Sequence, residues 1–226
     1  MTDPVSHLRR TPLRRALDAE NVRWRNLGDA AISEVPAANT AGLVIADLSP
    51  FPRLGFKGRG TIDAMKKRGV AVEAEPNRAF AQPDGGLCLV LAPGEVILLS
   101  NLKGEGQHFD QMLSGWRLED EERTYPLLRR DSHAWFAIRG ADAPRMFAKI
   151  CGIDLRTCKF PPLAIAQTSV AKMSAIIVRA DDKIVPMYHV LADSAAALYF
   201  WTCLFDAALE FQGRIAGPDA LLSAGS

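Results

Sequence analysis

The same short pattern occurs twice in the chain, and this repetition constrains the fold more than any other feature. The first copy, "RLGFKGRGTIDAMKKRGVAVEA" (53–74), contains an apolar run, Gly58, a helix-like decade and a second extended run. The second copy, "AWFAIRGADAPRMFAKICGIDL" (134–155), follows the same order around Gly140. The sequence therefore predicts a strand, a glycine and a helix at two places 82 positions apart.

Helix-capping residues mark both predicted helices. We expect the first helix over 61–68, with Thr61 as its N-cap and Gly69 as the left-handed residue that ends it. In the second copy Asp142 is the expected N-cap, and Pro144 occupies the first turn, where its missing N–H costs nothing.

Each copy continues with two extended runs around a polar break. The runs at 87–100 are separated by Pro93-Gly94, and those at 174–191 by Asp181-Asp182, so both predict hairpins. A helix closes each copy, near 106–113 and over 194–211. The predicted unit is strand, helix, strand, strand, helix, used twice, and its class is α+β with helices covering sheets.

The predicted domain organisation follows from this repeat. Residues 1–40 form an N-terminal helix and lead-in, and 41–211 form one two-lobed domain with halves 41–118 and 124–211. The acidic run at 119–123 suits a solvated connection between the halves. We expect 212–226 to be a flexible tail.

Composition excludes several classes of function. A net charge of +1 provides no clustered positive charge for nucleic acid or for an anionic membrane. No apolar run approaches the ~20 residues that span a bilayer. The four cysteines form no C-x-x-C pair and the four histidines have no ligand spacing, so we expect no metal site and a cytoplasmic, reducing environment.

Two segments carry a resemblance to a known family. "IADLSPFPRLGFKGRGTIDAM" (45–65) contains Asp47, Ser49 and Gly58, and "DGGLCLVLAPGEVILLSN" (84–101) contains a Gly-Gly pair and a hairpin ending in Asn. Both resemble the folate-binding domain of aminomethyltransferases, the glycine-cleavage T-protein family. The resemblance implies a folate-binding-domain-like fold built from two such halves.

A narrower resemblance covers roughly 8–211. The "RRTPL" start (9–13) and "CKFPPLAIAQTSVAKMSAIIVR" (158–179) are similar to the gamma subunits of heterotetrameric sarcosine oxidases. The shared positions are Phe160, Pro161, Ala166, Gln167 and Thr168. Members of that group stop after this domain, whereas T-proteins continue into a further barrel.

The catalytic acid of the T-protein family is missing from this sequence. That family places an Asp after its Gly-Gly pair, where aminomethyl transfer needs a carboxylate. Here Gly85-Gly86 is followed by Leu87 and Cys88, and His189 or a neighbour stands where a later Glu would hold the pterin. We therefore expect no catalytic residue. The positions that the resemblance still implies for ligand contact are Asn101, Arg179 and Tyr188.

The resemblance implies a function within an assembly. We expect a non-catalytic, gamma-type subunit of a sarcosine oxidase-like N-methyl amino-acid oxidase or dehydrogenase that feeds one-carbon units to tetrahydrofolate. By resemblance, FAD, FMN, NAD and tetrahydrofolate bind partner subunits, which are larger flavin-bearing chains and a small zinc subunit. The alternative is a stand-alone folate-binding, aminomethyltransferase-like one-carbon transfer protein.

The helix predicted at 194–211 bears on the partner contact. Leu198, Trp201, Phe205 and Ala208 have the spacing of one face and are expected to pack on the sheet. Phe200, Leu204 and Phe211 would then turn away, either beneath the N-terminal helix or tail or into a subunit contact. Arg129 and Arg130, before a predicted strand, lie on a solvated edge or pair with an acidic patch on a partner.

Overall fold

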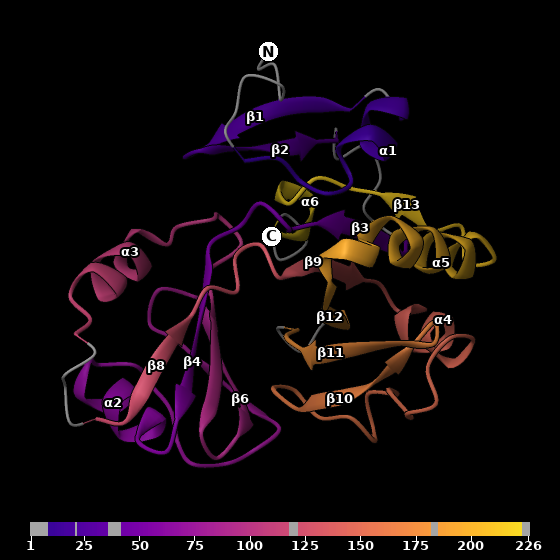
Figure 1. Ribbon diagram of the computed structural model, residues 1–226. Helices are drawn as coiled ribbons and strands as arrows, with labels where there is room; N and C mark the ends of the chain where they lie inside the picture. Colours follow the sequence, from indigo (N-terminus) through magenta and orange to yellow (C-terminus); the bar gives the residue numbers. More distant parts are fainter. Residues whose placement is uncertain (1–8, 21, 36–41, 118–121, 182–184, 223–226) are drawn as a thin grey trace. The chain divides into compact units, whose positions relative to one another are not determined.

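The chain folds into two compact units, and neither is continuous in sequence (Figure 1). The computed structural model describes residues 9–20, 22–35, 42–117, 122–181 and 185–222. Unit 1 comprises residues 1–50, 132–162 and 166–226, and unit 2 comprises residues 51–131 and 163–165. Each unit has its own sheet, and together they give the α+β class that the sequence predicts.

Unit 2 is a five-stranded sheet with two helices. Its sheet has the order β5-β6-β7-β4-β8, and every neighbouring pair is antiparallel. The elements are β4 (Arg53–Gly58), α2 (Thr61–Lys67), β5 (Arg78–Ala81), β6 (Leu87–Ala92), β7 (Glu95–Leu99), α3 (Gln107–Ser114) and β8 (Thr124–Leu127).

The core of unit 2 lies on one face of this sheet. Alternate residues of each strand point to the same face, so Leu54 and Phe56 of β4 share a cluster with Val96 and Leu98 of β7. The helices supply Ile62 and Met65 from α2 and Phe109 from α3 to this cluster. The period-2 pattern of the strands therefore places α2 and α3 on the same side of the sheet.

Unit 1 contains a six-stranded sheet of order β10-β11-β12-β9-β3-β13. Strand β13 pairs with β3 in parallel, and β11-β12, β12-β9 and β3-β9 are antiparallel. The elements are β3 (Val44–Asp47), β9 (His133–Arg139), α4 (Ala143–Ala148), β10 (Ile165–Val170), β11 (Met173–Arg179), β12 (Met187–Asp193), η2 (Ser194–Ala196), α5 (Ala197–Leu209) and β13 (Arg214–Ile215).

Both ends of the described chain pack into unit 1. Helix α1 (Arg14–Ala19) is followed by an antiparallel hairpin of β1 (Arg23–Leu27) and β2 (Ala30–Glu34), which the sequence analysis did not predict. After β13 the chain forms α6 (Asp219–Leu222), in which Ala220 and Leu221 are buried. The prediction of a flexible tail is therefore wrong for 212–222, because this segment adds a strand to the sheet and buries apolar side chains; residues 223–226 lie outside the described residues.

The two sheets share one order of strands. The order β5-β6-β7-β4-β8 in unit 2 corresponds strand by strand to the order β10-β11-β12-β9-β3 in unit 1. Strands in the same place of the two sheets also come in the same order along their halves of the chain. The predicted hairpins at 87–100 and 174–191 are confirmed as β6-β7 and β11-β12. Strands β5 and β10 were not predicted, and neither were β8, β3 and β13, so the observed sheets have five and six strands where the sequence pattern indicated three in each copy.

Gly58 and Gly140 occupy matching places in the two units. Each follows the strand that precedes a helix, with φ of 155° and 150°. The N–H of Gly58 donates to the carbonyl of Gly94 in the turn of the first hairpin (2.8 Å), and that of Gly140 donates to Pro186 before β12 (3.0 Å). A Cβ at Gly58 would lie 2.1 Å from the Arg123 carbonyl oxygen, and one at Gly140 would lie 2.8 Å from Leu43 Cα.

The leading strands explain why the units are not continuous. Strand β3 precedes β4 in the chain but pairs with β9, while β8 precedes β9 but pairs with β4. The first strand of each predicted half, β3 in 41–118 and β8 in 124–211, thus belongs to the sheet of the other half. The predicted halves 41–118 and 124–211 therefore do not coincide with the compact units.

Three local predictions need correction or completion. Gly60, not Thr61, is the N-cap of α2, and the Thr61 hydroxyl instead donates to the Gly58 carbonyl at 2.8 Å. Asp142 is the N-cap of α4, but its carboxylate binds Arg145 rather than the helix backbone. Residues 119–121 of the acidic run lie outside the described residues, and Glu122 is engaged by Arg68 at 2.7 Å rather than solvated.

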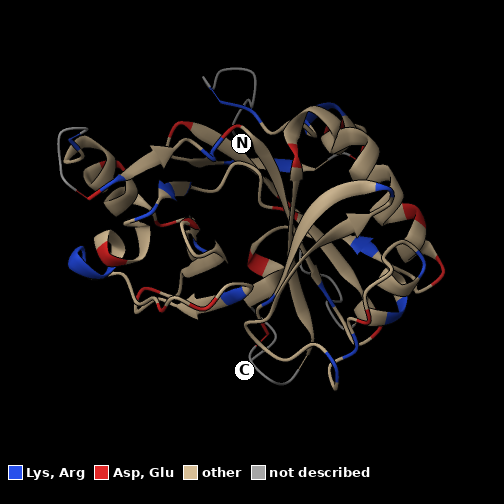
Figure 2. Ribbon diagram, turned by 60° about the horizontal axis from the view of Figure 1, so that its bottom comes forward, with Lys and Arg blue, Asp and Glu red and all other residues tan. Residues whose placement is uncertain are grey.

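Lys and Arg are interspersed with Asp and Glu along the described elements (Figure 2). The densest basic run, at the end of α2, is paired with acids: Lys66 with Glu73 at 2.6 Å, and Lys67 and Arg68 with Glu122 at 3.8 and 2.7 Å. Within the described ranges, every helix is too short or too polar to cross a bilayer.

Candidate functional site

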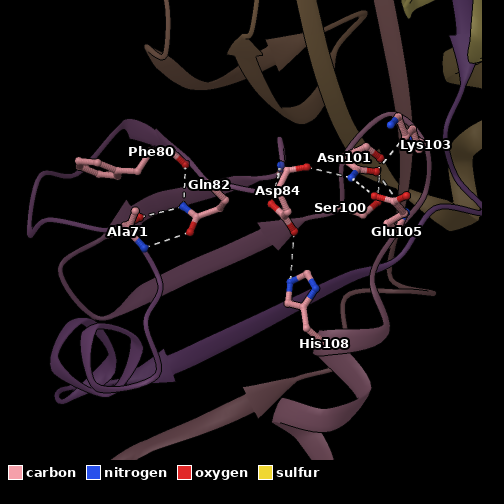
Figure 3. Close-up of polar contacts among 10 residues, drawn as sticks. Ala71, Phe80, Gln82, Asp84, Ser100, Asn101, Lys103, Glu105 and His108 are labelled. Atoms are coloured by element: carbon pink, nitrogen blue, oxygen red, sulfur yellow. Dashed lines mark hydrogen bonds and ion pairs between the residues drawn. The ribbon is translucent and has the colours of Figure 1, made fainter.

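Asn101, the first predicted ligand position, holds a turn in unit 2. Its amide nitrogen donates to the carbonyl of Asp84 (2.9 Å) and to Glu105 (2.8 Å). Its amide oxygen accepts the backbone N–H groups of Lys103 and Glu105, each at 3.1 Å. The side chain is buried, and these contacts use both ends of the amide for the loop after β7 (Figure 3).

Arg179, at the end of β11, also makes hydrogen bonds to other residues of the chain. Its guanidinium donates to both carboxylate oxygens of Asp181 (2.5 and 2.9 Å) and to the carbonyls of Thr157 (2.8 Å) and Phe160 (2.6 Å). The ion pair is buried, with side-chain exposures of 8% for Arg179 and 1% for Asp181. The hydrogen bond to Asp181 raises the pKa of Arg179, so the guanidinium is held as a structural cation.

Tyr188 lies opposite Arg179 in the β11-β12 register and is fully buried. Its hydroxyl donates to the carbonyl of Leu155 at 2.7 Å, and its ring contacts Phe147 and Phe160 at centroid distances of 5.3 and 6.4 Å. Burial raises the pKa of Tyr188 to about 12, so the phenol stays protonated. The structure brings Arg179 and Tyr188 together in unit 1, whereas Asn101 belongs to unit 2.

The segment after Gly85-Gly86 is a buried strand without a carboxylate. Leu87 begins β6, and Cys88 is completely buried in the core of unit 2. Burial raises the pKa of the Cys88 thiol to about 12, which leaves it protonated and unreactive at neutral pH. This segment supplies neither an acid nor a thiolate for catalysis.

His189 is a neutral core residue of unit 1. Its Nδ1 accepts a hydrogen bond from Trp135 Nε1 at 3.1 Å, and the two rings meet edge to face. Burial lowers the pKa of His189 to about 4, so the imidazole is uncharged at neutral pH. Across the part of the chain that the structure describes, no group of three His, Cys, Asp or Glu side chains could hold a metal ion.

The predicted orientation of the helix at 194–211 is wrong. In α5, Phe200 and Leu204 are completely buried, while Leu198, expected on the sheet side, is 56% exposed. Phe200 stacks on Phe136 of β9 at 5.6 Å. The helix is apolar around most of its circumference, so the spacing of apolar residues did not determine which face meets the sheet.

Phe211 is half-buried and is engaged within the chain. The Arg145 guanidinium lies 5.0 Å from its ring centroid, and the Lys149 ammonium lies 6.0 Å from it. These cation–π contacts tie the end of α5 to α4. The prediction of a partner surface is therefore wrong for Phe200 and Leu204, which are buried inside unit 1, whereas a partner contact of half-buried Phe211 stays a prediction.

The exposed face of α5 carries a different set of apolar side chains. Leu198 and Leu209 are each 56% exposed and Tyr199 is 52% exposed, and half-buried Phe205 lies on the same side. Leu198 and Leu209 are eleven positions apart, about 20° around the helix, so they form one stripe. We call Leu198, Phe205 and Leu209 the outer stripe of α5.

Arg129 and Arg130 follow β8 in unit 2. Arg129 pairs with Glu95 at 2.5 Å, and the carbonyls of Arg129 and Arg130 accept hydrogen bonds from buried Arg53 at 2.9 and 2.6 Å. The segment is thus fixed to the sheet by Arg53. A contact of these two arginines with an acidic partner stays a prediction.

A cavity of about 550 Å³ opens in unit 2 beside α3. At its rim, Asp84 of the β5-β6 turn and His108 of α3 point toward each other, with 3.8 Å between Oδ2 and Nε2 (Figure 3). The sequence analysis missed both residues as site candidates. They are 24 positions apart on different elements, and no local pattern connects them.

Comparison with solved structures identifies the fold. A chain of heterotetrameric sarcosine oxidase from Corynebacterium sp. U-96 superposes with a TM-score of 0.69 at 20% identity, over 92% of this chain and 98% of that one. Glycine cleavage system aminomethyltransferase T from Bartonella henselae superposes with a TM-score of 0.70 at 12% identity, over 94% of this chain and 60% of that one. At these identities the likeness establishes a shared fold.

Comparisons of sequence add no further relative. No family model matches the chain, and no curated protein matches it significantly.

Proposed function

We propose that this chain is a non-catalytic, gamma-type subunit of a sarcosine oxidase-like N-methyl amino-acid oxidase or dehydrogenase. The observation that carries the proposal is the superposition with a chain of heterotetrameric sarcosine oxidase over 98% of that chain's length. The narrower sequence resemblance, at 158–179, points to the same group.

The chemistry of the predicted site supports a role without catalysis. Aminomethyl transfer needs a carboxylate beside the reacting nitrogen. The strand after Gly85-Gly86 offers buried Leu and Cys side chains instead, and His189 is buried and neutral. Internal hydrogen bonds engage the polar groups of Arg179, Tyr188 and Asn101. In the proposal, the flavin, NAD and folate chemistry therefore belongs to larger partner subunits.

The proposal includes an origin by duplication. The matching strand orders of the two sheets support it. The matching environments of Gly58 and Gly140 support it as well, because each glycine donates to its own hairpin turn and lies against the start of an exchanged leading strand. A duplicated unit whose first strands are exchanged accounts for both features.

The outer stripe of α5 is the proposed contact with a larger subunit. Exposed apolar side chains that form one stripe on a helix are a common feature of protein interfaces. We expect the double variant Leu198→Glu/Leu209→Glu to keep its fold, because both side chains are exposed, and to lose most of its assembly with the larger subunits. The measurement is the amount of larger subunits that co-purify with the tagged chain from its native cell, beside its circular dichroism spectrum.

Two further variants make this test specific. Leu222→Glu replaces another exposed leucine of unit 1 outside α5 and should assemble normally. Phe200→Glu is expected to unfold the chain, because Phe200 is completely buried against Phe136. Normal assembly of a folded Leu198→Glu/Leu209→Glu variant would place the contact elsewhere.

A further inference from the structure

The cavity of unit 2 has the size and lining of a binding site for a small molecule. Its volume of about 550 Å³ lies inside the range of small-molecule sites. It is lined by the end of α2, the β5-β6 turn, strands β6 and β7, and one side of α3. All of these elements belong to unit 2, so the cavity is complete within that unit.

The polar end of the cavity is a carboxylate held in a fixed position. Asp84 Oδ1 accepts the N–H of Gly86 at 2.9 Å, and the Asp84 carbonyl accepts the Asn101 amide at 2.9 Å (Figure 3). Asp84 Oδ2 faces His108 Nε2 at 3.8 Å, which is too long for a hydrogen bond. Among the described residues, this oxygen accepts no hydrogen bond, and Asp84, whose side chain is 38% exposed, is one of the residues that line the cavity.

The other charged group of the lining is already matched. Arg68 Nη1 donates to Glu122 at 2.7 Å and to the Ala64 carbonyl at 3.0 Å, and the guanidinium lies 3.9 Å from the Trp116 ring centroid. Within the ranges that the structure describes, His108 is the one Lys, Arg or His side chain within 4 Å of the Asp84 carboxylate, at 3.8 Å.

Gln82 and Gln111 also line the cavity, and the Gln82 amide is bonded to the backbone of Ala71 and Phe80. Most of the remaining lining is apolar. Phe109 and Leu98 are buried in the core behind it, and Val70, Leu87 and Met112 form partly buried walls. A ligand for this lining has an apolar body and one positively charged hydrogen-bond donor. We propose that the cavity binds a small organic ammonium compound, with its ammonium group on Asp84 Oδ2 and its body against Phe109 and Met112.

This site does not depend on the proposed assembly, so it is testable on the isolated full chain. The probe is 2-phenylethylammonium, and its neutral near-isostere is 2-phenylethanol. At pH 8, calorimetry and chemical-shift titration should show the ammonium binding about tenfold or more tightly than the alcohol, because a hydrogen bond to a charged group is worth more than one to a neutral group.

Asp84→Asn tests the carboxylate directly. Asparagine keeps an oxygen for the Gly86 N–H, so the turn is preserved while the charge is lost. We expect affinity for the ammonium probe to fall about tenfold or more and affinity for the alcohol to be unchanged. Asp110→Asn, on the same helix as His108 but outside the cavity lining, is the matched control and should bind like the unchanged chain.

Met112→Trp provides a second variant that leaves the carboxylate intact. The larger side chain fills the cavity and should abolish binding of both probes while the chain stays folded. The proposal is overturned by equal binding of ammonium and alcohol, by unchanged affinity in a folded Asp84→Asn chain, or by no binding of the ammonium up to about 10 mM. Should Asp84→Asn unfold, retained binding in Met112→Trp overturns it as well.

Discussion

Replacing Arg179 with leucine is expected to lower the free energy of unfolding by about 3 to 5 kcal/mol, because the change strands a buried carboxylate. The Asp181 side chain is 1% exposed and accepts two hydrogen bonds from Arg179. The carbonyls of Thr157 and Phe160 lose their donor in the same variant. Urea unfolding of the purified chain measures the loss.

A second Arg–Asp pair in unit 1 provides the matched control. Arg156 binds Asp154, also two positions away, at 2.6 Å, but both side chains are well exposed. Arg156→Leu should therefore cost far less stability than Arg179→Leu, since water replaces the lost partner. In addition, Arg179→Leu/Asp181→Asn should recover part of the loss, because the stranded charge is gone. Similar stabilities for both single variants would mean that Arg179 is not the structural cation described above.

Gly58→Ala is expected to lower the free energy of unfolding by at least about 3 kcal/mol, or to prevent folding. The new Cβ would lie 2.1 Å from the Arg123 carbonyl oxygen and 2.5 Å from Thr124 Cα, where β8 begins. These are backbone atoms, so relief requires β8 to move away from β4. The φ of 155° at this position adds strain of its own. Urea unfolding or the yield of soluble chain measures the effect.

Gly69→Ala measures the cost of a left-handed backbone at alanine without the steric overlap expected at Gly58. Gly69 ends α2 with φ of 78°, and a Cβ there would meet no atom within 4 Å. The loss expected for Gly69→Ala is about 1 to 2 kcal/mol, from the left-handed backbone alone. If Gly58→Ala cost no more than Gly69→Ala, β8 would not be packed against Gly58 as described.

The elements predicted from the sequence are those with strong local signals. The hairpins at 87–100 and 174–191 combine apolar runs with turn residues, and the helix at 61–67 ends at Gly69 with a left-handed φ. Each of these signals lies within one continuous segment of at most 18 residues, so no tertiary information was needed to find it.

The features that the sequence did not predict depend on pairing between distant segments. Strands β3 and β8 are four residues long, and nothing within them indicates that each pairs with a strand of the other copy. Strand β13 has two residues and exists only because β3 lies beside it. The orientation of α5 was missed for a related reason, since the stacking of Phe200 on Phe136 cannot be read from the helix alone.

The surroundings of the candidate site residues depend most on contacts between distant parts of the chain. The resemblance supplied Asn101, Arg179 and Tyr188 as ligand positions, but their internal partners, such as Asp181 and the Leu155 carbonyl, are visible only in the folded chain. Asp84 and His108 come together because the β5-β6 turn lies beside α3, a juxtaposition that no spacing in the sequence encodes.

The most direct test of the proposed function is native mass spectrometry of the tagged chain purified from its native cell. The proposal predicts a stoichiometric complex of this chain with larger, flavin-containing subunits, and oxidative demethylation of an N-methyl amino acid by that complex. Recovery of the 24.6 kDa chain alone, with aminomethyl transfer to tetrahydrofolate by the isolated chain, would contradict it and favour a stand-alone one-carbon transfer protein.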